Sequence, residues 1–196
     1  NASASGVTTP FSTTSETASL LITPVQISLH LSTEGNVSGS GAPGLDTWSN
    51  SEALSFGGPI ISFEPGTTDG TFLSLFDLDS YADKSVSIDA MHFVSSNITV
   101  GAGGNTVDLL KEDVLFAIAE NSVTFTGDDA VSVLVSQKDV IRFRPSDRTF
   151  EIVLDDVMPS SIEGVSLVET NTTFVDGTTL TSGSSGSLLE MVTTPS

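Results

Sequence analysis

The stretch VQISLHLS, residues 25–32, is the most regular pattern in the sequence. Its apolar residues are separated by single polar ones, and successive side chains of an extended strand point to opposite faces. The apolar face consists of Val25, Ile27, Leu29 and Leu31. This period of two predicts a half-buried strand. We expect it to occupy residues 18–33, because the apolar residues 20–22 precede it.

The segments on either side of this strand have the composition of flexible chain. Residues 1–17 lack periodicity and are expected to form a flexible arm, and residues 34–53 begin with the Gly/Ser-rich sequence GNVSGSGAPG at position 35. A strand tethered in this way can be donated to the open sheet edge of a neighbouring subunit. It can equally pair within its own domain, and the sequence leaves both alternatives open.

Residues 54–196 consist of short apolar, β-branched runs broken by turn clusters such as PGTTDG, GAGGN, TGDD and RPSD. Seven such runs are residues 60–63, 71–76, 86–94, 114–119, 131–135, 140–143 and 150–154. Only residues 107–121 could alternatively form a helix, and their β-branched flanks favour strand. The sequence therefore predicts an all-β fold, a jelly-roll-like β-sandwich preceded by an extended strand.

Two parts of this domain, residues 60–100 and 140–175, repeat each other in order and at similar spacing. Such an echo predicts two related β units. The matched segments are ISFEP at 61–65 with IRFRP at 141–145, TFLSLFD at 71–77 with TFEIVLD at 149–155, and SIDAMHFV at 87–94 with SIEGVSLV at 161–168.

The series IDAMHFV, DVLFAIAENSVTF, DVIRFRP and TFEIVLDD resembles the repeat units of bacterial exported surface proteins, over about residues 60–169. This resemblance implies an extracellular, β-rich protein and supplies no reaction. Many such units can follow one another, as in a propeller. The two units here are too few to close a ring within one chain.

The charge of the chain excludes two classes of partner. Its 196 residues include 25 acidic and 6 basic side chains, a formal net charge of −19. No surface of such a chain can gather the cations that bind nucleic acid or an anionic membrane. No apolar run approaches the roughly 20 residues of a membrane-spanning helix. A positive mean hydropathy of +0.18 nevertheless indicates a chain that folds.

Cysteine is absent, so disulfides, thiolate metal sites and thiol catalysis are not available to this chain. Together with scarce lysine and abundant serine and threonine, this composition favours an exported protein. Four Asn-x-Ser/Thr sequons occur in the chain, and the three that follow the one at Asn1 are candidate glycosylation sites in a host that glycosylates. They are Asn36, Asn97 and Asn171.

Clustered carboxylates suggest calcium as a cofactor, because calcium takes six to eight oxygen ligands in flexible geometry. The first candidate cluster is Asp77, Asp79 and Asp83 in DLDSYAD, with Asp89 following on the next strand; the second is Asp128 and Asp129. Tyr81 and Ala82 depart from the EF-hand pattern, which places an oxygen ligand and a glycine there. The alternative is that these acids are simply solvated turn residues.

All three arginines lie within seven residues of one another. Arg142 and Arg144 are expected on one face of their strand, and Ile141 and Phe143 on the other. The first unit has Glu64 at the position that matches Arg144. These side chains could form an ion pair between repeats or between subunits. The alternative is ordinary cross-strand ion pairing on a surface sheet, which contributes little stability.

Neither histidine predicts catalysis. His30 lies on the polar face of its strand, and His92 shares a face with Ile88, Ala90 and Val94, which favours a hydrogen-bonded structural role. No nucleophile elbow, zinc-protease, P-loop or dinucleotide motif is present. The sequence thus predicts a non-enzymatic, self-assembling structural subunit. The alternative is a monomeric binding module for glycans or surface proteins, for which Trp48 and Tyr81 are the usual stacking platforms.

Overall fold

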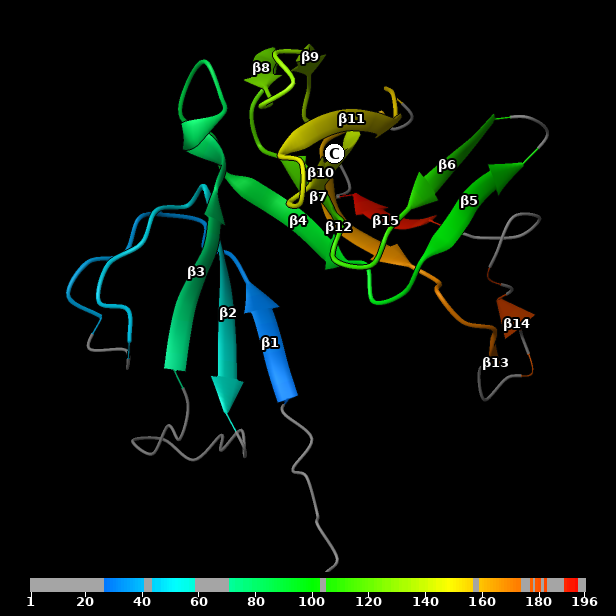
Figure 1. Ribbon diagram of the computed structural model, residues 1–196, viewed down its shortest axis with the longest axis horizontal. Coiled ribbons are helices and arrows are strands. Elements are labelled where there is room, and N and C mark those ends of the chain that lie inside the picture. Colours follow the sequence, from blue (N-terminus) through cyan, green and yellow to red (C-terminus); the bar gives the residue numbers. More distant parts are fainter. Residues whose placement is uncertain are drawn as a thin grey trace, which may run out of the picture.

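The computed structural model describes residues 27–40, 44–58, 71–102, 105–156, 159–173, 177, 179–180, 182 and 189–193. Within these residues the fold is all-β, with antiparallel sheets and one short 3₁₀ helix, η1 (Leu78–Ser80) (Figure 1). The predicted all-β, sandwich-like architecture is confirmed. None of the described residues belongs to a helix long and apolar enough to cross a membrane.

The strands are short and follow one another at turns. In chain order they are β1 (Ile27–Leu31), β2 (Glu52–Gly58), β3 (Thr71–Asp77), β4 (Ile88–Phe93), β5 (Ile98–Ala102), β6 (Asn105–Leu109), β7 (Val114–Ile118), β8 (Val123–Thr126), β9 (Ser132–Val135), β10 (Val140–Arg144), β11 (Thr149–Leu154), β12 (Ile162–Leu167), β13 (Thr172–Thr173), β14 (Thr179–Leu180) and β15 (Leu189–Thr193).

Two sheets organise the molecule. The N-terminal sheet has the order β1-β2-β3, and the central sheet has the order β11-β10-β7-β4. Four two-stranded sheets surround them: β5-β6, β8-β9, β12-β15 and β13-β14. Figure 1 shows the N-terminal sheet running away from the central sheet on one side and the β5-β6 hairpin on the other.

The core lies on both faces of the central sheet, as β7 shows. All five residues of this strand, VLFAI, are buried. Val114, Phe116 and Ile118 belong to one apolar cluster, while Leu115 and Ala117 belong to a second. A strand covered on both faces is apolar at every position and loses the alternation that marks a half-buried strand. Residues 107–121 therefore form a strand, a turn and a strand, as their β-branched flanks favoured.

A bulge in β4 changes which residues share a face. Ile88 lies opposite Ile118 and Ala90 opposite Ala117, so that Asp89 is an extra residue in β4. Ile88 consequently packs in the first cluster, whereas Ala90 and Val94 pack in the second. The expectation that His92 shares a face with Ile88 is wrong, because the extra residue reverses the alternation between them.

The strand predicted at residues 18–33 is present in its second half as β1, which pairs with β2 over five residues. Val25 lies outside the described residues. The face expected to be polar is turned towards the body of the domain, where Ser32 Oγ donates to the Ile88 carbonyl at 3.2 Å. On the opposite face Leu29 is 47% exposed and Leu31 is half-buried.

The connection from β1 to β2, predicted as a Gly/Ser linker over 34–53, is held in part by hydrogen bonds. Val37 and Trp48 form an antiparallel bridge, with N···O distances of 2.8 and 3.0 Å. The Trp48 indole donates to Thr33 Oγ1 at 3.0 Å, and its ring stacks near Phe72. Trp48 thereby has a structural role, anchoring the connection to the N-terminal sheet.

The segments that echo each other in sequence are placed in different sheets. The TFLSLFD segment forms β3 in the N-terminal sheet, and its counterpart forms β11 in the central sheet. The SIDAMHFV segment contributes β4 to the central sheet, and its counterpart contributes β12, which packs against β4 and β7. The ISFEP segment lies outside the described residues, and its counterpart forms β10.

Candidate functional site

A bulge in β3 turns two consecutive apolar side chains towards one hollow. Phe76 lies opposite Ala53 and Ser74 opposite Leu54, so Leu75 has no partner in β2. Both Leu75 and Phe76 line a hollow between the N-terminal sheet and β4. Leu75 is nonetheless 44% exposed, which is unusual for a large apolar side chain beside a core.

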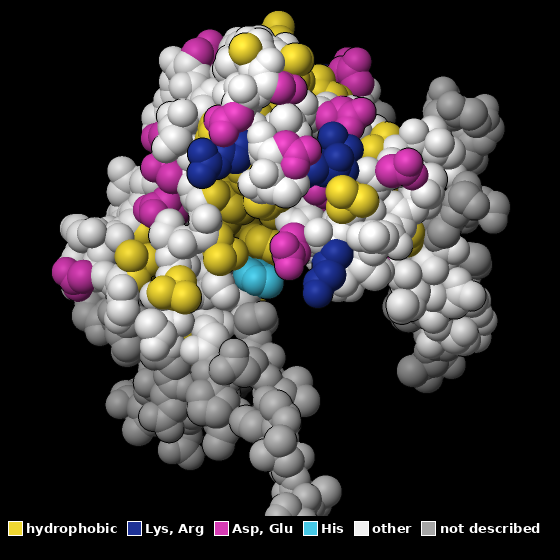
Figure 2. All heavy atoms as spheres, viewed as in Figure 1, with side chains coloured by type: hydrophobic (Ala, Val, Ile, Leu, Met, Phe, Trp, Pro, Cys, Tyr) yellow, Lys and Arg dark blue, Asp and Glu magenta, His cyan; other side chains and the backbone are white. Residues whose placement is uncertain are grey.

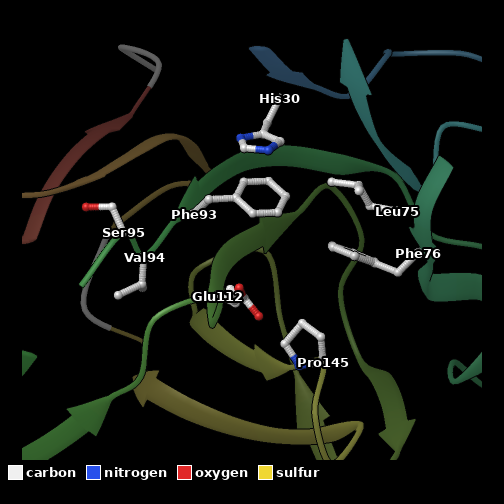
Figure 3. Close-up of a pocket in the computed structure, with 8 residues that line it drawn as sticks. All are labelled: His30, Leu75, Phe76, Phe93, Val94, Ser95, Glu112 and Pro145. Carbon is white, nitrogen blue, oxygen red and sulfur yellow. The ribbon is translucent and has the colours of Figure 1, made fainter. Parts of the chain in front are cut away.

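We call this site the apolar hollow. It encloses about 420 Å³ and is lined chiefly by His30, Leu75, Phe76, Phe93, Glu112 and Pro145. Figure 3 shows His30 above Phe93, with Leu75 and Phe76 beside them and Glu112 and Pro145 on the opposite side. Its volume lies in the range of roughly 300–1,000 Å³ that is usual for binding pockets.

The stacked rings of His30 and Phe93 join β1 to β4 across the hollow. Their centroids are 3.8 Å apart and their planes are inclined by 22°. Burial lowers the pKa of His30, because a charged imidazole loses hydration there. His30 therefore contributes an apolar, aromatic wall rather than a cation at neutral pH.

Glu112 borders the hollow from the turn between β6 and β7, in a left-handed backbone conformation with φ of +79°. A non-glycine residue rarely adopts this conformation unless its surroundings enforce it. The enforcing contacts run to β4: Glu112 N donates to the Val94 carbonyl, and Val94 N donates to the Asp113 carbonyl. The backbone hydrogen bonds with Val94 thus hold both the strained conformation of Glu112 and the wall of the hollow.

Asp113 holds this turn from inside the protein and is 1% exposed. Its Oδ2 accepts the Leu110 N–H at 2.9 Å. The Arg144 guanidinium donates from Nε to Oδ1 and from Nη2 to Oδ2, both at 2.9 Å. This forked hydrogen bond raises the pKa of Arg144. Asp139 makes the same kind of turn before β10, where it accepts the Ser136 N–H.

Charges balance around the apolar hollow, although the whole chain is strongly acidic. Two further pockets, of about 510 and 280 Å³, share lining residues with it. The three together are lined by three cations, Lys111, Arg144 and Arg148, and by three acids, Asp77, Glu112 and Asp113. This region thus holds half of the six basic residues and only three of the 25 acidic ones.

Figure 2 shows the same face of the molecule, with apolar side chains gathered in its centre and basic, acidic and histidine side chains around them. The Lys111 ammonium makes no ion pair or hydrogen bond within the described part of the chain, whereas each of the other five cationic side chains has a partner there. An apolar region whose lining charges balance, and in which one ammonium makes no direct ion pair, is suited to an apolar partner with little net charge.

Next to the hollow, the carboxylate of Glu169 ties the end of β12 to the end of β4. It accepts the N–H groups of Ser95 and Ser96 at 2.8–2.9 Å and both of their hydroxyls. His92 Nε2 lies 3.0 Å from Oε1. Burial alone would raise the pKa of Glu169, but the hydrogen bonds from Ser95, His92 and Ser96 lower it overall.

A Glu169→Gln substitution is expected to lower the free energy of unfolding by about 1–3 kcal/mol at pH 7, because one amide oxygen cannot replace two carboxylate oxygens among these donors. The lowered pKa means that the carboxylate stabilises the fold fully above the unfolded value of about 4.3 and loses this effect as pH falls through the folded value. The free energies of unfolding of the two proteins, measured with urea, should therefore approach each other as the pH is lowered.

The matched control is Glu163→Gln, an exposed glutamate on β12, which should change stability by less than about 0.5 kcal/mol. A difference between the Glu169→Gln variant and the original protein that does not shrink as the pH falls below the unfolded value of about 4.3 would contradict the assignment.

The first calcium candidates each accept hydrogen bonds from a different part of the chain. Asp77 Oδ1 accepts the Asp79 N–H and the Ser51 hydroxyl at the start of η1. Asp79 accepts from Val86 N and Ser85 Oγ. Asp83 accepts the Thr124 N–H at 3.0 Å, a bond that lowers its pKa. Each carboxylate thus stabilises a different piece of backbone.

The second candidates and Asp89 lie elsewhere. Asp129 accepts the Val131 N–H within its own turn, and Asp128 lies 3.4 Å from Arg148. Burial and the neighbouring acids Glu120, Glu163 and Glu34 raise the pKa of Asp89. Within the described ranges, no group of three or more His, Cys, Asp or Glu side chains is arranged to hold a metal ion. Calcium binding stays a prediction.

The other candidate residues occupy defined places. Arg142 pairs across the strands with Glu151 at 2.8 Å, and Glu64 lies outside the described residues. The three sequon asparagines are exposed, and in each the side-chain oxygen accepts a backbone N–H. These asparagines are Asn36, Asn97 and Asn171.

Sequence reasoning did not single out Asp113, Glu169 or Phe93. The DV pair that opens both β7 and β10 was a usable signal for Asp113, because a turn followed by a fully apolar strand needs a buried acceptor. Glu169 and Phe93 gave no local signal, since the contacts that place them at the site are distant in sequence: the stacking of Phe93 on His30, and the hydrogen bonds of Glu169 with His92 and Ser95.

Fold and site together define an all-β protein with a neutral, partly aromatic hollow at the junction of two sheets. No family model matches the chain, and no curated protein or solved structure proved similar to it.

Proposed function

We propose that this protein is a non-enzymatic structural subunit of an extracellular filament, tube or surface layer, which assembles with copies of itself through its N-terminal strand segment, residues 18–33. The observation that carries the proposal is the position of β1. It is an outer strand of the N-terminal sheet and pairs only with β2 among the described strands. An outer strand offers backbone N–H and C=O groups to another chain.

The surroundings of β1 support this proposal. Leu29 projects from one face of the strand and is 47% exposed, and Leu73 is exposed on the opposite face of the same sheet. Large apolar side chains exposed on an outer sheet are typical of interaction surfaces. Because β1 and β2 are separated by the long connection 32–51, β1 can also exchange between copies and make the same contacts with a neighbour.

The composition supports an extracellular location, since a cysteine-free, lysine-poor and serine/threonine-rich chain suits an exported polymer. Calcium is proposed as a stabilising ion for the assembly, because carboxylates of neighbouring subunits could together supply the oxygen ligands that the described part of a single chain does not gather. A second candidate function is a monomeric binding module, which the apolar hollow favours because it is large enough for a ligand.

Negative-stain electron microscopy of the full chain, with calcium and with EDTA, tests this proposal. Regular filaments, tubes or sheets are expected, and their dissociation in EDTA would support the calcium sites. A Leu29→Lys variant should fail to assemble while keeping its circular dichroism spectrum, because it places a charge on the apolar face of an exposed strand.

The matched control for this variant is Leu134→Lys, which makes the same change in charge at a leucine on β9 that is 64% exposed. It should assemble normally. Small, dispersed particles of the full chain in both conditions would overturn the structural-subunit proposal and favour the binding module. Filaments indifferent to EDTA would keep the assembly and discard calcium.

A further inference from the structure

We infer that the apolar hollow is the acceptor site for the N-terminal apolar segment, residues 18–25, of a second copy of this chain. The inference rests on the proposed function, which it deepens by naming the two surfaces that meet. The hollow lies beside β1, whose His30 forms part of its wall. The segment lies outside the described residues and immediately precedes the chain that leads into β1.

Charge is the first argument for this occupant. Two copies that each carry a net charge of −19 repel one another over most of their surfaces. The lining of the hollow and of its two adjoining pockets is an exception, since it holds three cations and three acids. Residues 17–33 contain no Asp, Glu, Lys or Arg. An uncharged segment and a neutral hollow can therefore meet without bringing like charges together.

Chemical match is the second argument. The hollow presents Leu75, Phe76 and the stacked rings of His30 and Phe93. The segment supplies Leu20, Leu21, Ile22 and Val25. Burial in the hollow of Leu21 and Val25, which share one face of the predicted strand, would remove apolar surface on both copies from water. The Lys111 ammonium, which has no partner among the described residues, lies in the adjoining pocket and could approach Glu16, just upstream of the segment.

The experiment uses the absence of cysteine from the chain, because each engineered thiol is then unique. A Leu21→Cys variant that carries a mass tag and an untagged Leu75→Cys variant of the full chain are mixed under mild oxidation, and mixed disulfide-linked dimers are separated from homodimers by mass on non-reducing gels. We expect the mixture to form mixed dimers at least about tenfold faster than a mixture of Leu21→Cys with Leu134→Cys, because docking raises the local thiol concentration only at the hollow.

Faster cross-linking to Leu75→Cys than to Leu134→Cys would support the inference. Equal cross-linking to Leu75→Cys and Leu134→Cys, or none to either, would overturn the inference. Cross-linking confined to an internal bond in the Leu21→Cys/Leu75→Cys double variant would show that the segment fills the hollow of its own chain, and would overturn it as well. Filaments of the full chain seen beside such results would leave the proposed function standing and dismiss only this acceptor site.

A second variant guards against an effect on folding. Leu75→Glu places a carboxylate in the hollow at a position that is already 44% exposed, so its circular dichroism spectrum should not change. The critical concentration for assembly should rise at least about tenfold, because the carboxylate would lose hydration on docking. Leu134→Glu is the matched control and should assemble as the unmodified chain does. Unchanged assembly of Leu75→Glu would overturn the inference.

Discussion

An Asp113→Ala substitution is expected to lower the free energy of unfolding by about 3 kcal/mol, one of the two largest effects predicted for a single residue of this protein. The carboxylate is 1% exposed, and it accepts two hydrogen bonds from Arg144 and one from Leu110 N. Its removal leaves a half-buried guanidinium without its anion and an N–H group without an acceptor. The loss of stability is measured as a shift in the midpoint of urea unfolding, while the dependence of the free energy on urea concentration should not change.

The matched control is Asp128→Ala, which removes the acid of the ion pair with Arg148. Both partners of that pair are more than half exposed, and its loss should cost less than about 1 kcal/mol. The double variant Asp113→Ala/Arg144→Met should be less destabilised than the two single variants added together, because it leaves no unpaired charge. Equal losses for Asp113→Ala and Asp128→Ala would contradict the buried role of Asp113.

A Phe150→Ala substitution is expected to lower the free energy of unfolding by about 3–5 kcal/mol, through lost apolar contacts and the cavity that remains. Phe150 contacts four other rings of the aromatic cluster beside the central sheet. Its ring centroid lies 4.9 Å from those of Phe143 and Phe125, 5.4 Å from that of Tyr81 and 6.5 Å from that of Phe116. In a chain of this length the midpoint of thermal unfolding should fall by about 10 °C.

Phe150→Leu provides the comparison, since it keeps most of the buried volume and should cost about 1–1.5 kcal/mol. If the alanine variant were no less stable than the leucine variant, ring packing at Phe150 would not be an important source of stability. Tyr81 belongs to the same cluster, which assigns it a packing role and explains its presence without a glycan ligand.

Local patterns were sufficient to predict several strands, both half-buried ones and β7, which is buried on both faces. The alternation at residues 25–32 predicted β1, and the apolar runs near residues 71, 114, 140 and 150 correspond to β3, β7, β10 and β11. The opposite faces of Ile141 and Arg142 also followed from the alternation, since Ile141 is fully buried and Arg142 pairs with Glu151 across the sheet. These predictions succeeded because side-chain direction in a regular strand depends only on residue parity.

The candidate site was much less predictable. Two bulges, at Leu75 in β3 and at Asp89 in β4, reverse the parity within their strands. As a result Leu75 and Phe76 both line the hollow, and His92 lies on the face opposite to that of Ile88. No local pattern marks these bulges, because an extra residue is accommodated by the neighbouring strand and the packing around it.

The sequence by itself determined the all-β class, the positions of about half of the strands, and the strong negative charge of the chain. These properties depend on composition and on periods of a few residues. The tertiary structure alone decided that His30 stacks on Phe93, that Arg144 pairs with Asp113, and that a neutral hollow forms within an acidic chain. Such contacts join residues 31 to 63 positions apart, so they depend on how the sheets pack and not on any local pattern.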